Sequence, residues 1–184
     1  MTTTTKDKLI IMACIWVLLF LIIAKLCEAS EPPGPRDRVD LALWLARACI
    51  GEAGWRSAET GECAAIAHVF HKRSYMAPGR DYFTAMRDYS AALRVGLKTR
   101  PWLRNLRRDG RRPRLLEGQI YWGKHRALWL KTLELADRFF RGRIPDPTPE
   151  ALHFGGLMDV KNMDPDQWAI INVNFKNKFW RKKI

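Results

Sequence analysis

Residues 41–54 read LALWLARACIGEAG, and this stretch decides the fold of the domain. Its apolar side chains recur at spacings of three and four residues, which places them on one face of an α-helix. The stripe comprises Leu41, Trp44, Leu45, Ala48 and Cys49. Asp37 or Asp40 is available as the N-cap of this helix. The spacing predicts a core helix that ends between Gly51 and Gly54.

Outward from this helix, three more apolar stripes predict further helices. They comprise Cys63, Ile66, Ala67 and Phe70 in a helix that starts near Ser57; Phe83, Met86, Ser90, Leu93 and Leu97; and Trp129, Leu133, Ala136 and Phe140, ending at Gly142. Residues 170–175 alternate in polarity, which favours a loop and a short strand. We therefore expect a mainly α domain with a small irregular or β part at its C-terminal end.

The N-terminal residues contain an uncharged apolar run from Leu9 to Ala24, preceded by Lys6 and Lys8. Such a run is either a membrane helix or the core of a signal peptide. We favour an uncleaved signal anchor, with cleavage before Ser30 as the alternative. We expect a membrane segment in residues 1–30, a proline-rich linker in 31–36 and one domain in 37–184. In both cases the domain lies in the periplasm or otherwise outside the cytoplasmic membrane.

The charge of the chain is strongly positive, with a formal net charge of +13. The densest cluster of arginines spans residues 104–114 and surrounds Asp109. Such a cluster favours a polyanionic partner, namely nucleic acid, anionic lipid or an anionic cell-wall polymer. An exported domain makes nucleic acid the least expected of the three.

Two of the four cysteines, Cys49 and Cys63, fall in the domain. They lie on facing stripes of two predicted helices, and an exported domain reaches an oxidising compartment. A disulfide and simple core packing both remain open. The cysteine spacing does not fit a zinc site. His68 and His71 lie on one helix face without a third ligand and are expected at the surface, so we predict no metal and no cofactor.

Glu52 is the residue whose placement most needs an explanation. It follows Ala48 by four positions and Trp44 by eight, so a helix that persists this far carries its carboxyl on the apolar stripe. Burial disfavours a charged carboxyl, and a carboxyl kept protonated near neutral pH can donate a proton to a leaving oxygen. The alternative is a glutamate at a helix end that turns toward solvent, and periodicity alone favours this alternative.

Several segments in order carry a family resemblance. They are residues 45–54 (LARACIGEAG), residues 64–73 (AAIAHVFHKR), Asp146-Pro147, residues 151–156 (ALHFGG) and residues 177–180 (NKFW). Together they resemble the cell-wall hydrolase family that includes spore-cortex-lytic enzymes. The resemblance implies a lysozyme-like, mostly helical fold that acts on peptidoglycan as a lytic transglycosylase or muramidase, with Glu52 as the catalytic acid. Residues 80–142 lie outside the resemblance.

The expected mechanism uses one carboxylate. Glu59 and Glu62 are expected at the surface, where they complement the dipole of the second helix. Asp159 is an alternative as the base that activates water. Glycosidases usually pair two carboxylates, whereas the resemblance implies that in a lytic transglycosylase the 6-hydroxyl of the sugar attacks. The lack of an evident second carboxylate favours a transglycosylase that cleaves the MurNAc-GlcNAc β-1,4 bond.

Candidate substrate-binding residues lie in two places. The Gly-Gly pair of Gly155 and Gly156 follows His153 and Phe154 and permits close approach of a substrate. The candidates here are His153, Phe154 and Gly155, although a packed core histidine is the commoner interpretation of His153. Tyr121 and Trp122 are aromatic side chains that can stack on sugars, although aromatic residues between helices usually belong to the core.

The alternative function is that of a non-enzymatic, membrane-tethered basic protein that binds DNA, anionic lipid or cell wall. Trp102 is the one aromatic residue near the arginine cluster, and binders of single strands usually carry more. Secretion, conjugation and phage machineries are the candidate assemblies for the enzyme, and conjugation or phage entry for the alternative.

Overall fold

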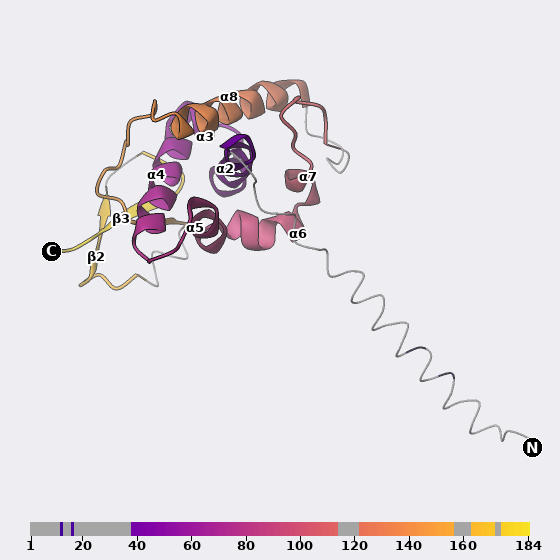
Figure 1. Cartoon of the computed structure of the whole chain (residues 1–184). Coiled ribbons are helices and arrows are strands. Elements are labelled where there is room, and N and C mark those ends of the chain that lie inside the picture. Colours follow the sequence, from indigo (N-terminus) through magenta and orange to yellow (C-terminus); the bar gives the residue numbers. More distant parts are fainter. Residues whose placement is uncertain (1–11, 13–15, 17–37, 114–121, 157–162, 172–173) are drawn as a thin grey trace, which may run out of the picture. The chain divides into compact units, whose positions relative to one another are not determined.

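The computed structural model describes Met12, Trp16 and residues 38–113, 122–156, 163–171 and 174–184 (Figure 1). The chain divides into two compact units, Met1–Gly34 and Pro35–Ile184. The predicted membrane segment and linker lie outside the described residues, apart from Met12 and Trp16. Among the residues that are described, no helix combines the length and the apolar character needed to cross a membrane.

The described domain is mainly α, as the sequence predicts. Its helices are α2 (Arg38–Ala53), α3 (Ser57–Thr60), α4 (Glu62–Tyr75), α5 (Tyr82–Tyr89), the π-helix η1 (Ala92–Gly96), α6 (Leu97–Thr99), α7 (Pro101–Arg104) and α8 (Trp122–Phe140). Its strands are β1 (His153–Gly155), β2 (Trp168–Ile171) and β3 (Lys178–Lys182).

Helix α2 is the central helix of the domain. It packs against α8, α4 and η1, and Figure 1 shows it between α8 and α5. Every residue from Leu45 to Ile50 is at most 9% exposed, because neighbours cover α2 on most sides. The four alanines from Ala42 to Ala53, both included, let these neighbours come close. The predicted core helix is therefore confirmed. Its end is held by several elements.

The second predicted helix is interrupted at Gly61. This glycine has φ +80°, a left-handed backbone conformation that residues other than glycine rarely adopt. The chain therefore forms the short helix α3 and then starts α4 at Glu62. The prediction of one continuous helix from Ser57 was wrong at this point, because the stripe of apolar residues does not report a backbone turn.

The third predicted helix is interrupted at Ser90, which has an extended backbone with φ −92° and ψ 113°. Helix α5 ends before it and η1 begins after Ala91, so the stripe from Phe83 to Leu97 belongs to separate elements. A π-helix is rare and often occurs at a functional site. The fourth helix agrees with its prediction, and Gly142 follows it with φ +69°.

The C-terminal part forms a three-stranded antiparallel sheet in the order β1-β3-β2. His153 pairs with Trp180 and Gly155 pairs with Lys178. Of the stretch 170–175, expected as a loop and a short strand, residues 170 and 171 end strand β2, while residues 172 and 173 lie outside the described residues. Strand β3 was not predicted as a strand, because its residues 178–182 (KFWRK) are few and do not alternate between apolar and polar.

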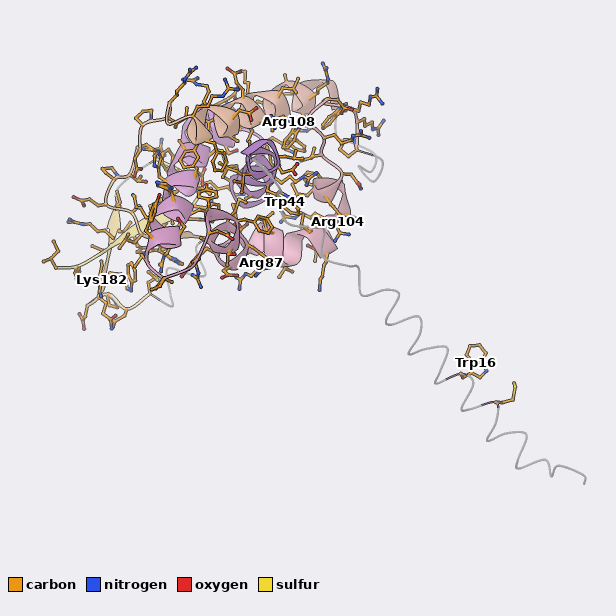
Figure 2. The ribbon with its side chains drawn as sticks, viewed as in Figure 1. Trp16, Trp44, Arg87, Arg104, Arg108 and Lys182 are labelled. Atoms are coloured by element: carbon orange, nitrogen blue, oxygen red, sulfur yellow. A yellow bond between two sulfur atoms is a disulfide. The ribbon has the colours of Figure 1, made fainter. Side chains whose placement is uncertain are left out.

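The arginine cluster folds onto α8 through its main chain. The indole Nε1 of Trp129 donates to the carbonyl of Arg107 (2.7 Å), and Arg126 Nε donates to the carbonyl of Gly110 (3.1 Å). Arg108 forms a bidentate ion pair with Asp137, with both distances 2.8 Å; Figure 2 shows Arg108 beside α8. This segment is therefore an integral part of the domain.

The structure joins Cys49 of α2 to Cys63 of α4 in a disulfide, with a Cα–Cα distance of 5.1 Å. Both residues are fully buried, so the bond ties the central helix to its neighbour inside the core. Of the two alternatives that the sequence left open, the structure has the disulfide.

Candidate active site

Glu52 lies in the last turn of α2 with its side chain half-buried. Its Oε1 atom accepts hydrogen bonds from Ser90 Oγ (2.7 Å) and from the backbone N–H of Ala92 (2.8 Å). No donor among the described residues is hydrogen-bonded to Oε2. One oxygen of the carboxyl is thus fixed as an acceptor, and the other is the oxygen left for a proton.

The two donors reach Glu52 because η1 approaches α2 closely at Gly51. A Cβ atom at this glycine would overlap Ala92 Cβ and would lie 3.1 Å from Leu103 Cδ2. Ser90 Oγ also accepts from the N–H of Leu93 (3.2 Å), which fixes its hydroxyl for donation to Glu52. The N–H of Ala92 lies at the start of a helical turn, where backbone donors lack partners within the helix.

Glu62 corrects a prediction. It was expected at the surface, yet it is 2% exposed and accepts three hydrogen bonds. The N–H of Lys176 donates to Oε2 (3.2 Å), while the N–H and the side-chain amide of Asn177 both donate to Oε1 (2.8 Å each). Glu62 is thus a buried carboxyl with both oxygens in use. Glu59 does lie at the surface, where hydrogen bonds from Lys131 and then Arg56 lower its pKa.

An aromatic cluster follows Glu52 in the chain, centred on Trp55. The ring of Trp102 stacks on Trp55 at 5.3 Å, His125 lies 4.5 Å from it, and Trp122 meets it edge-on at 6.2 Å. All four side chains are half-buried, and Trp122 Nε1 donates to the carbonyl of Gly110. Trp122 thus contacts Trp55, which lies three positions after Glu52 in the sequence. Tyr121 lies outside the described residues.

The three β1 residues differ in how they are connected to Glu52. Gly155 pairs with Lys178, which directly follows the Asn177 that bonds to the backbone carbonyl of Glu52 (3.3 Å). Phe154 is 7% exposed, and its ring packs against Phe70 (5.5 Å) in the core. His153 lies at the other end of β1, where its ring is 5.5 Å from that of Trp180.

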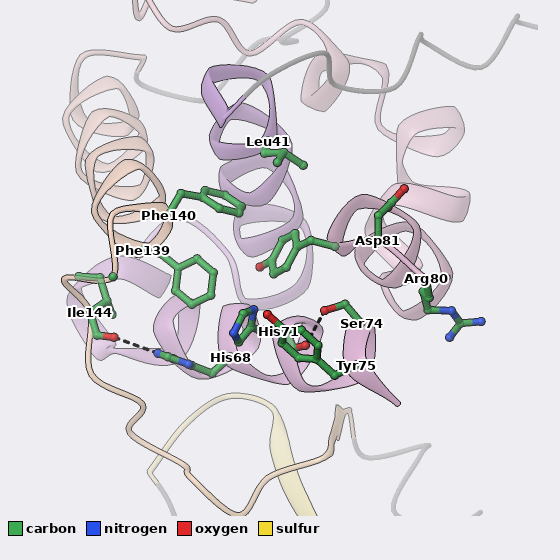
Figure 3. A pocket seen from close by; sticks show the side chains of 12 residues that line it. Leu41, His68, His71, Ser74, Tyr75, Arg80, Asp81, Phe139, Phe140 and Ile144 are labelled. Atoms are coloured by element: carbon green, nitrogen blue, oxygen red, sulfur yellow. Dashed lines mark hydrogen bonds between the residues drawn. The ribbon is translucent and has the colours of Figure 1, made fainter. Parts of the chain in front are cut away.

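A separate pocket of about 600 Å³ lies between α4, α5 and α8 (Figure 3). Its lining residue from α2 is Leu41. Leu41 precedes Glu52 by eleven residues, a separation of about 16 Å along a helix. Its aromatic walls come from Tyr82, Phe139 and Phe140, and burial raises the pKa of Tyr82 well above 10. This pocket is not at Glu52.

The two histidines of α4 both line this pocket, and one of them differs from its prediction. His68 is half-buried, because its Nε2 is hydrogen-bonded to the carbonyl of Ile144 (3.0 Å). His71 is exposed as expected. Its pKa is lowered, mainly because part of its ring is buried and to a lesser extent by the nearby charges of His68 and Lys72. Within the described residues no group of three His, Cys, Asp or Glu side chains can hold a metal ion.

Sequence reasoning missed Ser90, Glu62 and the role of Asn177. One signal was present: Glu62 precedes Ile66 and Phe70 by four and eight positions, so it shares their buried face. Ser90 stood in an apolar stripe, where a hydroxyl needs a partner when buried. Asn177 stood in one of the segments that carry the family resemblance.

Comparisons with family models, with curated proteins and with solved structures gave no match.

Proposed function

We propose that the domain is a lysozyme-like, peptidoglycan-cleaving glycosidase in which Glu52 is the catalytic acid and base. The observation that carries the proposal is the way the carboxyl is held. Ser90 Oγ and the N–H of Ala92 both donate to Oε1, at 2.7 and 2.8 Å, so a proton on the carboxyl is directed to Oε2. A carboxyl held through one oxygen, whose other oxygen has no donor among the described residues, is suited to general acid catalysis.

In the first step, Glu52 donates its proton to the oxygen of the MurNAc-GlcNAc β-1,4 bond. The bond between that oxygen and C1 of MurNAc breaks, and C1 takes on oxocarbenium character. The negative charge that remains on Glu52 is stabilised by the donors from Ser90 and Ala92, which need not move during the step.

In the second step, the ionised Glu52 takes the proton from the 6-hydroxyl of the same MurNAc residue. That oxygen bonds to C1 and gives a 1,6-anhydro product without consuming water. One carboxyl is enough for both steps. Among the described residues the other carboxyl close to the site is Glu62, which is buried with both oxygens hydrogen-bonded, and this supports a lytic transglycosylase over a hydrolase. Asp159, the alternative base for water, lies outside the described residues.

Substrate binding is proposed for two surfaces. The aromatic cluster of Trp55, Trp102 and Trp122 offers flat apolar faces beside the end of α2, and such faces suit the apolar faces of sugars. At strand β1 the candidates are His153 and Gly155, because Phe154 is 7% exposed and packs in the core. Gly155 is joined to the site through the pairing of β1 with β3.

We also propose that the domain works outside the cytoplasmic membrane, held there by the N-terminal apolar run. The Cys49–Cys63 disulfide supports this location, because disulfides persist in oxidising compartments.

Replacing Glu52 tests the proposal. Glu52→Gln keeps the shape of the side chain but cannot donate an acidic proton, so release of soluble fragments from purified peptidoglycan should fall about 10²- to 10⁴-fold. Glu59→Gln is the matched control, since Glu59 is an exposed glutamate close in the sequence, and its activity should equal that of the wild type. Retention of more than about a tenth of the activity in Glu52→Gln would remove Glu52 from the acid role.

A further inference from the structure

The carboxyl of Glu62 is buried at the start of α4. Among the described residues no ion pair involves it, and its negative charge is met instead by three N–H groups from Lys176 and Asn177. It is also the first residue of α4, where the helix dipole favours a negative charge. Taking a carboxylate out of water is costly, so such a group is retained only where its hydrogen bonds are well satisfied.

Asn177 carries the connection from Glu62 to Glu52. It is 6% exposed, and its side-chain nitrogen has two hydrogens. One is donated to Glu62 Oε1 (2.8 Å) and the other to the backbone carbonyl of Glu52 (3.3 Å). Because Glu62 accepts only, it fixes which end of the Asn177 amide faces Glu52.

The carbonyl that Asn177 reaches belongs to the last turn of α2, where carbonyl groups have no partner within the helix. The neighbouring carbonyl of Gly51 accepts from Arg100 (3.2 Å) and that of Ile50 from Gly54 (3.0 Å). The end of α2 is therefore held by residues from distant parts of the chain. Its orientation decides whether the Glu52 carboxyl meets Ser90 and Ala92.

We propose that Glu62 is a positioning residue for Glu52, acting through Asn177, which fixes the last turn of α2 against the C-terminal segment. Its effect on turnover rests on the proposed function, whereas its effect on the geometry does not. Glu62 itself does not touch substrate. A glutamine at this position would lose one acceptor and set its own N–H₂ against the N–H of Lys176, so a carboxylate is required.

Hydrogen exchange of single backbone amides in the full-length chain, measured by NMR, tests the geometry. The N–H of Ala92 is bonded to Glu52 Oε1, so it reports whether the carboxyl is in place. In Asn177→Ala its protection should fall about tenfold, the value of one hydrogen bond, with a smaller fall in Glu62→Gln. The N–H of Ala85, bonded to the carbonyl of Asp81 in α5, is the internal reference and should keep its protection. Glu59→Gln should change neither.

Kinetics on peptidoglycan fragments supply the second readout. In both variants kcat should fall about tenfold or more with KM nearly unchanged, because a misplaced catalytic group lowers the rate more than the binding. The proposal is overturned if Ala92 keeps wild-type protection, or if Ala92 and Ala85 lose protection by the same factor, which is general destabilisation. A wild-type chain that never cleaves peptidoglycan refutes the proposed function instead, and the exchange of Ala92 still decides the positioning role.

Discussion

At the residue scale, the central feature is a carboxyl held through one oxygen. Ser90 has two roles, since its Oγ donates to Glu52 and accepts from the N–H of Leu93. It is fully buried, so a substitution removes both hydrogen bonds without admitting solvent freely. The hydroxyl of Ser90 therefore connects the Glu52 carboxyl to the start of η1, and the site depends on this connection.

Ser90→Ala should lower kcat on peptidoglycan about tenfold, because one of two donors to the ionised Glu52 is lost. It should also lower the free energy of unfolding by about 1–3 kcal/mol, since the N–H of Leu93 is left buried without a partner. Steady-state kinetics and denaturant unfolding measure the two effects. Ser74→Ala is the control, because Ser74 is a buried serine of α4 that bonds to the carbonyl of His71. Equal kcat values for the two variants would contradict the role of Ser90.

The sequence predicted Glu52 at the residue scale but not its partners. Its position on the apolar stripe of α2 follows from helical periodicity, which is a local property. Ser90 and Asn177 meet it from 38 and 125 residues away, and such contacts depend on tertiary packing. Glu62 was misjudged because its place in a first helical turn suggested a dipole effect, while its place on the buried face of α4 was the stronger signal.

At the scale of elements, the close contact between α2 and η1 sets the geometry of the site. Gly51 allows it, and the alanine at position 92 is the residue that fills the space. The apolar stripes predicted α2 and α8 well, because both are long and continuous. They failed at Gly61 and Ser90, where the backbone turns while the apolar spacing continues.

Gly51→Ala should destabilise the domain by about 1–3 kcal/mol, because the new methyl group overlaps Ala92 and two packed backbones must separate. The movement should also withdraw the N–H of Ala92 from Glu52 and lower activity at temperatures where the variant is folded. Gly96→Ala is the matched control in η1, where a Cβ atom would lie 3.6 Å from Ala92 Cβ, an ordinary contact. Thermal unfolding of both variants is the measurement. A Gly51→Ala protein as stable and active as Gly96→Ala would show that the close contact is not needed.

At the scale of the whole molecule, the exposed positive charge and the proposed catalytic group, Glu52, lie on different residues. Asp137 and Asp109 each meet arginines of the cluster, yet Arg107, Arg111 and Arg112 remain exposed. Exposed arginines suit long-range attraction to an anionic wall or membrane surface. Mainly α architecture was predictable from composition and periodicity, whereas the way the cluster folds onto α8 was not, since it depends on main-chain carbonyls.

Replacing Arg107, Arg111 and Arg112 by glutamine should weaken sedimentation with peptidoglycan sacculi, and added salt should have the same effect, because exposed charges are screened beyond about 8 Å at physiological ionic strength. Turnover of short soluble glycans should stay unchanged. A triple replacement of Arg138, Arg141 and Arg143 is the control, since it removes the same charge at the other end of α8. Equal loss in both variants would assign the attraction to net charge, and loss of soluble turnover would place the cluster in the substrate-binding site.

The proposed cleavage of the glycosidic bond by Glu52, with the sugar's own hydroxyl as nucleophile, is tested most directly by the products. Purified peptidoglycan is digested with the full-length chain and with Glu52→Gln, and the released muropeptides are identified by mass spectrometry. The wild type should give 1,6-anhydro-MurNAc ends, one water lighter than hydrolysed ends, and the variant should give none. Reducing MurNAc ends, equal release by both proteins, or no release by a folded wild type would contradict it.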